Sequence, residues 1–209
     1  MMGREVEIDP AHTALLFIDV QNYTARRDGG EYRGVDPTEM EERYGYFFQR
    51  MESIALPNMR KLQSACRAGG IEIMYTVIES LTQDGRDRSL DYKISGLHVP
   101  RGSWDAAVLE AIAPLPDEII IPKTSSSPFV STNIDYVLRN LGVRSLIIAG
   151  ITNVSIRPFA THATLATSSP SRPTPARPTA RSGTIGRCVT TAAMRASARP
   201  MSCWPRSRG

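Results

Sequence analysis

The chain has 209 residues, which suits one domain with or without a tail and excludes a large multidomain assembly. Hydrophobic residues make up 41% of the sequence, so a wholly disordered chain is excluded. No run of about 18 apolar residues occurs, so we expect no membrane-spanning helix. The first residues lack a signal-peptide pattern, so we expect a cytoplasmic protein. The sequence has three cysteines, Cys66, Cys188 and Cys203, which are too few and too scattered for a disulfide framework or a zinc site.

The net charge of +4 conceals a division of the chain into two parts. Residues 1–150 carry 16 Lys and Arg against 21 Asp and Glu, whereas residues 151–209 carry nine Arg and no acidic residue. Seven of the 15 prolines also lie after residue 150. A basic segment of this kind is compatible with binding to nucleic acid or to another anionic surface.

The first 150 residues alternate between short apolar runs and segments in which apolar residues recur at helical spacing. Short apolar runs that end at polar residues are typical of buried parallel strands. The predicted strands are 13–18, 71–77, 118–121 and 144–149, and the predicted helices are 40–67 with a break or start at Pro57, 104–112, and a helix capped by Thr132 and closed by Gly142. Strands that alternate with helices imply a parallel sheet with right-handed crossovers, so the fold class is α/β.

Two segments do not follow this alternation. Residues 79–103 are polar and irregular, and they are long enough to form a lid or a binding loop. From residue 156 on, Ser, Thr, Arg, Pro and Ala dominate, and closely spaced prolines argue against regular structure. We therefore divide the chain into a domain over residues 1–155 and an irregular tail over residues 156–209.

Three polar features follow the predicted strands. Asp19 follows the first strand, Lys123 follows the third, and the run from Gly150 to Ser155 follows the fourth. Because ligands bind at the carboxyl ends of parallel strands, these groups can converge on one pocket. A carboxylate, an ammonium and a small nucleophile would form an acyl-transfer site, with Asp19 as general base, Lys123 as electrostatic partner and backbone N–H groups as oxyanion donors.

Each of these residues also has an ordinary structural interpretation. An Asp after a strand often caps a turn, and a Lys after a proline is more often a solvated loop residue. Trp104 fits a core position better than a platform for a ligand. No spacing typical of a metal site or a catalytic triad is found among His12, His98 and His162, and the glycine pair at 29 and 30 is too weak a motif for a phosphate loop.

Considered together, the motifs resemble the isochorismatase-like cysteine hydrolase superfamily over about residues 10–155. The motifs that carry the resemblance are, in chain order, Asp19-Val-Gln21-Asn22, Gly102-Ser-Trp104-Asp105, Pro122-Lys123-Thr and Gly150-Ile-Thr-Asn-Val. Their combination looks most like the amidohydrolase branch, which includes ureidoacrylate amidohydrolase and N-carbamoylsarcosine amidase. The resemblance implies a three-layer α/β/α fold with a mainly parallel sheet, and a homo-oligomer that needs no metal and no organic cofactor.

The resemblance also implies roles for particular residues. The family uses an Asp–Lys–Cys triad, so Asp19 is the expected base, Lys123 the middle member, and Ser155 stands at the nucleophile position. A cis peptide bond helps to form the family's oxyanion hole, and here it would join Ile151 and Thr152. The residues expected to bind the substrate, a small amide or a carbamoyl or ureido acid, are Gln21, Asn22, Trp104, Ile151 and Thr152.

The sequence departs from the family pattern at the nucleophile. The family runs Gly-Ile-x-Thr-Asn-x-Cys, whereas this chain is one residue shorter before Ser155, and a hydroxyl is a poor substitute for a thiolate. If the coding sequence from Arg157 onward is read in a frame shifted by one base, it can encode segments such as Thr-Val-Arg-Asp-Ala-Cys-Asp-Leu-Gly-Tyr. These segments fit the helix that the family has at this place and this chain lacks. We interpret the tail as an out-of-frame reading, which makes its basic charge a product of codon composition.

Three functional hypotheses follow from these observations. The first is an amidohydrolase that cleaves a C–N bond through an Asp–Lys–nucleophile triad. The second is a catalytically inactive relative, because the nucleophilic Cys is missing. The third, a nucleic-acid-binding protein that uses the basic tail, ranks last because the tail lacks interleaved aromatic residues and any known binding motif.

Overall fold

A computed structural model describes residues 8–151 together with the segments 161–167 and 188–194. The strands are β1 (Thr13–Ile18), β2 (Glu72–Ile78), β3 (Ile119–Lys123), β4 (Ser145–Gly150), β5 (Thr161–Thr167) and β6 (Cys188–Met194). The α-helices are α1 (Asn22–Ala25), α2 (Pro37–Arg50), α3 (Leu56–Ala68), α4 (Leu90–Ser95), α5 (Pro128–Ser131) and α6 (Ile134–Asn140). The shorter helical turns are η1 (Pro10–His12), η2 (Gly30–Tyr32), η3 (Met51–Ala55), η4 (Trp104–Ala106) and η5 (Glu110–Ile112).

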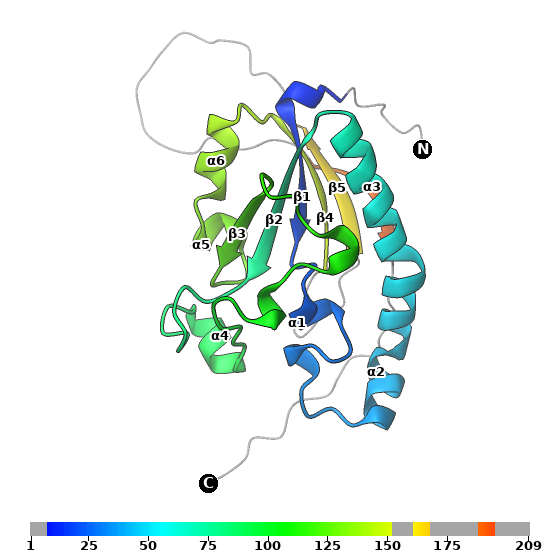
Figure 1. The fold of residues 1–209 in the computed structure, drawn as a ribbon, viewed down its shortest axis with the longest axis vertical. Coiled ribbons are helices and arrows are strands. Elements are labelled where there is room, and N and C mark those ends of the chain that lie inside the picture. Colours follow the sequence, from blue (N-terminus) through cyan, green and yellow to red (C-terminus); the bar gives the residue numbers. More distant parts are fainter. Residues whose placement is uncertain (1–7, 152–160, 168–187, 195–209) are drawn as a thin grey trace.

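The strands form a single sheet in the order β3-β2-β1-β4-β5-β6 (Figure 1). The four strands predicted from the sequence are all present, and β1, β2, β3 and β4 pair in parallel. The α/β fold class is therefore confirmed. In this order β1 lies between β2 and β4, so the chain that leaves β1 emerges at the centre of the parallel part of the sheet.

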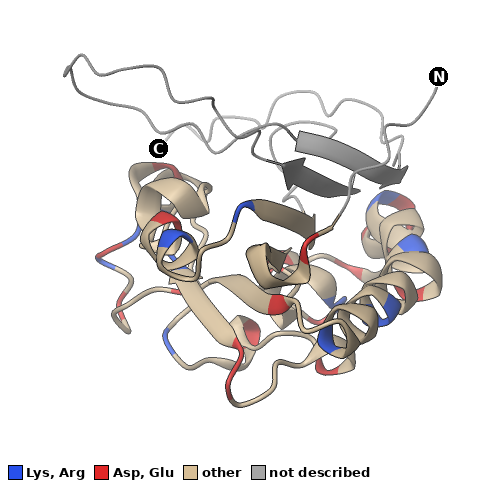
Figure 2. Cartoon of the chain, turned by 90° about the horizontal axis from the view of Figure 1, so that it is seen from above, with Lys and Arg blue, Asp and Glu red and all other residues tan. Residues whose placement is uncertain are grey.

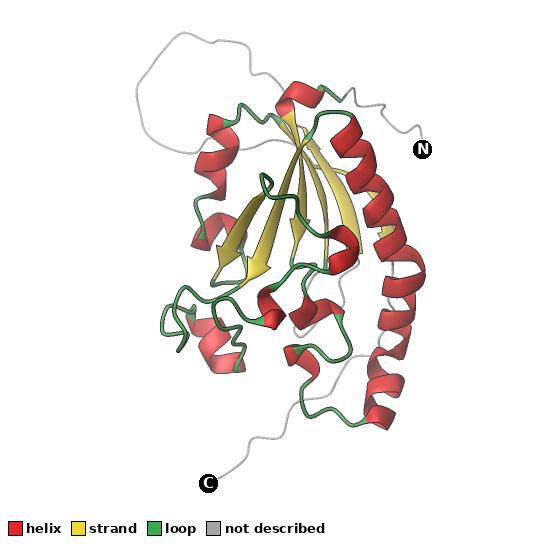
Figure 3. Ribbon diagram, in the orientation of Figure 1, coloured by secondary structure: helices red, strands yellow, loops and turns green. Residues whose placement is uncertain are grey.

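Helices cover both faces of the parallel strands (Figures 1 and 3). Alternate residues of a strand point to opposite faces, and the core divides accordingly. Leu15 and Phe17 of β1 pack in one cluster with Met59 of α3. Leu16, between them, packs in a second cluster with Leu138 of α6. The arrangement has three layers, as the resemblance implied.

The helical segments differ in detail from their predictions. Pro57 lies in the first turn of α3, as the predicted start at this residue requires, and a π-helical turn, η3, joins α2 to α3 just before it without interrupting the helical path. Proline has no N–H, so a widened turn just before it lets the chain continue without the hydrogen bond that proline cannot donate. The predicted helix 104–112 is replaced by two short turns, η4 and η5. The polar segment 79–103 contains a helix, α4, that periodicity does not reveal.

The segment expected to be irregular contributes β5 and β6 to the sheet. β5 pairs antiparallel with β4, and β6 pairs antiparallel with β5. Both stretches are free of proline and contain β-branched Thr or Val, which suit a strand, so they differ from the proline-rich sequence between them. The boundary predicted at residue 155, and most of the predicted tail, lie outside the described residues, so the division of the chain and the out-of-frame interpretation stay predictions.

Charged residues of both signs are interspersed over the helices and loops of residues 8–151 (Figure 2). Within the part of the chain that the structure describes, no helix has the length and apolar character needed to cross a membrane.

Candidate functional site

Asp19 is the first residue after β1, and its backbone is strained. Its φ angle is 58°, in the left-handed region that residues other than glycine seldom adopt, and strain of this kind is concentrated at functional sites. The backbone N–H of Asp19 donates to the carbonyl of Thr76 on β2, at 2.9 Å, which fixes the turn. The residue is 5% exposed. The fold therefore holds a buried carboxylate at the carboxyl end of the central strand.

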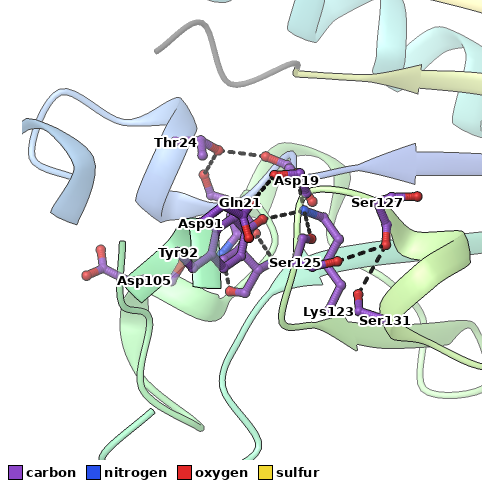
Figure 4. A network of polar contacts seen from close by, with 12 residues as sticks. Asp19, Gln21, Thr24, Asp91, Tyr92, Asp105, Lys123, Ser125, Ser127 and Ser131 are labelled. Carbon is purple, nitrogen blue, oxygen red and sulfur yellow. Dashed lines mark hydrogen bonds and ion pairs between the residues drawn. The ribbon is translucent and has the colours of Figure 1, made fainter. Parts of the chain in front are cut away.

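Lys123 ends β3 and reaches across the end of β2 to the same place (Figure 4). Its Nζ lies 2.9 Å from Oδ2 of Asp19, and the residue is 1% exposed. The Lys123 ammonium also donates hydrogen bonds to the Tyr92 hydroxyl at 3.0 Å and to the Ser125 carbonyl at 3.1 Å. The alternative of a solvated loop lysine is wrong for this residue, because Lys123 is a buried ion-pair partner.

Burial and the ion pair act on the protonation of both groups. Burial raises the pKa of Asp19 to about 6, although the Lys123 ammonium opposes this rise. Burial alone would lower the pKa of Lys123, but the Asp19 carboxylate and the Tyr92 hydroxyl outweigh it, and the pKa lies above its usual value. At neutral pH the pair is therefore a carboxylate beside an ammonium ion. Oδ1, the second carboxylate oxygen, is buried and accepts no hydrogen bond of good geometry from the described residues, although the nearby Thr76 hydroxyl acts to lower the pKa of Asp19.

β4 brings the third part of the predicted site next to Asp19. The N–H of Ile151 donates to the carbonyl of Ile18 at 2.9 Å, one residue before Asp19. Gly150 allows this approach, because a Cβ at that position would collide with the Ile18 carbonyl oxygen. Thr152 and Ser155 lie outside the described residues, and so does the peptide bond from Ile151 to Thr152 that was predicted to be cis. Their roles, and the convergence of Ser155 with Asp19 and Lys123, stay predictions.

Gln21 and Asn22, both expected to bind the substrate, bond to the protein itself. The Gln21 amide donates to the carbonyls of Ile78 and Asp105 and accepts from the N–H of Ile78 at 2.6 Å. Asn22 donates to the carbonyl of Trp104 at 2.9 Å. These bonds join the turn after β1 to the end of β2 and to the loop at 102–105. Both N–H groups of the Gln21 amide are used in these bonds, so a substrate can accept from them only by displacing a protein carbonyl.

Trp104 is 51% exposed, so its expected placement in the core is wrong. It begins the surface turn η4, its carbonyl is held by Asn22, and the Arg26 guanidinium lies 5.4 Å from the centre of its ring. These contacts leave the indole on the surface. The contact of this ring with a substrate stays a prediction.

A polar cavity of about 340 Å³ lies between the chain after β1 and the loop after α4. Its walls are formed by Tyr23, Gly30, Arg33, Gly96, His98, Pro100, Ser103 and Asp105. The Asp105 carboxylate accepts from the N–H of Gly30 at 3.0 Å and lies 3.5 Å from the Arg33 guanidinium. Asp19 and Lys123 are not among the wall residues, so the cavity does not include the ion pair.

Sequence reasoning missed two of the residues that surround Lys123. Tyr92 lies in the polar segment 79–103, which the sequence predicts only to be a lid or a binding loop. Ser125 contributes only its backbone carbonyl. A single tyrosine in a polar stretch carries no periodic signal, and a backbone acceptor has no signal at all. Among the described residues, no group of three or more His, Cys, Asp or Glu is arranged to hold a metal ion.

The isochorismatase domain family matches residues 13–166. The chain is similar to the ureidoacrylate amidohydrolases RutB of Rhizobium rhizogenes and Agrobacterium fabrum, with 28% identity to each over 72% of this chain. It spans 64% of the first relative's length and 69% of the second's. The crystal structure of a cysteine hydrolase from Pseudomonas syringae pv. phaseolicola is 25% identical, with a TM-score of 0.55 over 70% of this chain and 62% of that one.

Proposed function

We propose that this chain, which belongs to the isochorismatase family, is an amidohydrolase that cleaves a C–N bond of a small carbamoyl or ureido acid or amide. One observation carries the proposal: a buried carboxylate has one oxygen paired with Lys123, and its other oxygen, Oδ1 of Asp19, accepts no hydrogen bond of good geometry from the described residues. The names of the RutB relatives support the choice of ureido compounds.

The proposed reaction begins with attack by the side chain of residue 155 on the substrate carbonyl carbon. Its hydroxyl proton passes to Oδ1 of Asp19 as the oxygen–carbon bond forms. The C–N bond then breaks, the proton passes from Asp19 to the departing nitrogen, and an amine or ammonia leaves. A water molecule hydrolyses the resulting acyl-enzyme, again with Asp19 as the base. Backbone N–H groups after Ile151 would stabilise the negative charge on the carbonyl oxygen.

The properties of Asp19 suit both halves of this cycle. A general base works best when its pKa lies near the working pH, since it must accept a proton and then return it. A pKa of about 6 meets this condition, whereas an exposed aspartate would hold a proton too weakly. Lys123 keeps the carboxylate charged in a buried place, so the two residues act as a unit.

The second hypothesis, a relative without catalytic activity, is favoured by the serine at position 155. The same Asp19 and Lys123 pair would then bind a small amide without cleaving it. An assay of ammonia release from a panel of ureido and carbamoyl acids separates the two hypotheses. Four proteins are compared: the chain as it stands, Ser155→Cys, a frame-restored chain with Cys at this position, and that chain with Asp19→Asn.

We expect Ser155→Cys alone to restore little activity, because the sequence beyond position 157 differs from the family pattern. The frame-restored chain with Cys should release ammonia, and Asp19→Asn should abolish the release. If the frame-restored chain is inactive on the whole panel but binds one of the compounds, the non-catalytic hypothesis is correct. Full activity of the unmodified chain with every thiol alkylated would show that the assumed Cys nucleophile and the frame interpretation are both wrong.

A further inference from the structure

Helix α4 is fastened to the loop that follows Lys123. The N–H of Ser89, at the helix start, donates to the carbonyl of Thr124 at 2.9 Å. The Asp91 carboxylate accepts from the hydroxyl of Ser126 at 2.8 Å. The third contact is the bond from Lys123 to the Tyr92 hydroxyl. Three contacts from four consecutive residues fix α4 against this loop, as Figure 4 shows for Asp91 and Tyr92.

The segment before α4 is also held in one conformation. The Asp87 carboxylate accepts from the N–H of Leu81 at 2.8 Å and from the hydroxyl of Thr82 at 2.5 Å. The Arg88 guanidinium donates to the carbonyls of Gly85 and Leu97, at 2.9 and 2.7 Å. The segment therefore presents α4 as a formed structure, so the position of Tyr92 is set before any ligand binds.

The Lys123 ammonium has three N–H donors, and the structure provides three acceptors. They are the Asp19 carboxylate, the Ser125 carbonyl and the Tyr92 hydroxyl. Tyr92 is buried with Tyr23 and Ile78, so it also excludes water from the ammonium. A lysine side chain has four rotatable bonds, so its ammonium must be held in place by its acceptors. A buried N–H group without an acceptor is also costly in free energy. The tyrosine hydroxyl thus completes the set of bonds that aims Nζ at Asp19.

We propose that Tyr92 is a positioning residue, carried by α4, which holds the Lys123 ammonium against the Asp19 carboxylate. Its effect on catalysis rests on the proposed function, whereas its effect on Lys123 does not. The hydroxyl accepts a hydrogen bond from Lys123, and no acceptor for its own proton is found among the described residues.

The test measures Lys123 directly, without relying on activity. The sequence contains three lysines, and Lys61 and Lys93 are exposed, so they serve as internal references for amine acetylation followed by mass spectrometry. In the full-length chain Lys123 should acetylate far more slowly than these two. Tyr92→Phe removes one bond to a charged donor and should raise the Lys123 rate roughly tenfold or more relative to them.

The matched control is Tyr75→Phe, which removes another buried tyrosine hydroxyl, bonded to Gln63 and Glu118 near the opposite end of β3. It should leave the rate at Lys123 unchanged. Alkylation of Cys66, a buried thiol, reports on global unfolding and should be equal in the two variants.

The outcomes separate the two proposals. An unchanged Lys123 rate in Tyr92→Phe, or a rise matched at Cys66 or in Tyr75→Phe, would overturn the positioning role. A selective rise supports that role, even if no version of the chain hydrolyses an amide, in which case the proposed function alone fails. If the frame-restored chain is active, Tyr92→Phe should lower kcat about tenfold with KM nearly unchanged, since the alignment of Lys123 matters in the chemical step. A rise in KM alone would contradict the role.

Discussion

Replacing Lys123 with Met tests whether the buried ion pair is as important to the fold as its geometry indicates. Methionine has a similar volume and no charge, so the change removes the ammonium without leaving a large cavity. The Asp19 carboxylate would then be buried without its cation. The hydroxyl of Tyr92 and the carbonyl of Ser125 would lose their donor as well.

The expected loss in the free energy of unfolding is about 3–5 kcal/mol at pH 8, the usual effect of breaking a buried pair from one side. The loss should shrink as the pH falls. Burial raises the pKa of Asp19, and without Lys123 nothing comparable opposes that rise. The folded variant therefore binds a proton at a higher pH than the wild type, and protonation relieves the penalty.

The assay is urea unfolding followed by circular dichroism at pH 5 and pH 8. The exposed Lys93→Met is the matched control and should change the stability by less than about 0.5 kcal/mol. The double variant Asp19→Asn with Lys123→Met should be more stable than Lys123→Met alone by at least about 1 kcal/mol, because no charge is left unpaired. If Lys123→Met is no less stable than Lys93→Met at pH 8, the interpretation of the pair is refuted.

Three further predictions concern the turn after β1, a helix start and the pH dependence. Gln21→Ala should cost about 2–4 kcal/mol in urea unfolding, because it leaves the backbone groups of Ile78 unpaired, and a cost equal to that of the exposed Gln49→Ala would contradict this. Asp36→Ala removes the cap that accepts from two N–H groups of α2 and should cost about 1 kcal/mol by the same method, with no loss counting against the cap. In an active chain, kcat/KM should rise with pH through about 6 as Asp19 loses its proton, and a flat profile of kcat/KM from pH 5 to 8 would exclude Asp19 as the base.

The parallel strands could be predicted because each is an apolar run that ends at a polar residue. The same pattern placed Asp19 and Lys123 at the carboxyl ends of parallel strands, so their proximity was predictable. The prediction ended β3 at residue 121, but the strand continues through Pro122 to Lys123. β3 is an edge strand, where a residue without an N–H is tolerated on the unpaired side.

Other features of the site could not be predicted from local sequence. Helix α4 lacks an apolar stripe, since Leu90 and Ile94 are exposed and Tyr92 alone is buried, so periodicity gave no signal. The partner of Gln21 is Ile78, 57 residues further along the chain, and no spacing rule connects an amide with a distant strand end. The exposure of Trp104 likewise depends on loop contacts.

The central claim is that Asp19 and Lys123 activate the side chain at position 155 for attack on a carbonyl carbon. Mass spectrometry of the acyl-enzyme tests this most directly. The frame-restored chain with Cys at that position is mixed with a ureido acid, quenched within one turnover and digested. The account predicts an acyl adduct on residue 155 that is absent from Asp19→Asn and from Lys123→Met. An adduct on another residue, or equal adduct on residue 155 in Asp19→Asn, would contradict it.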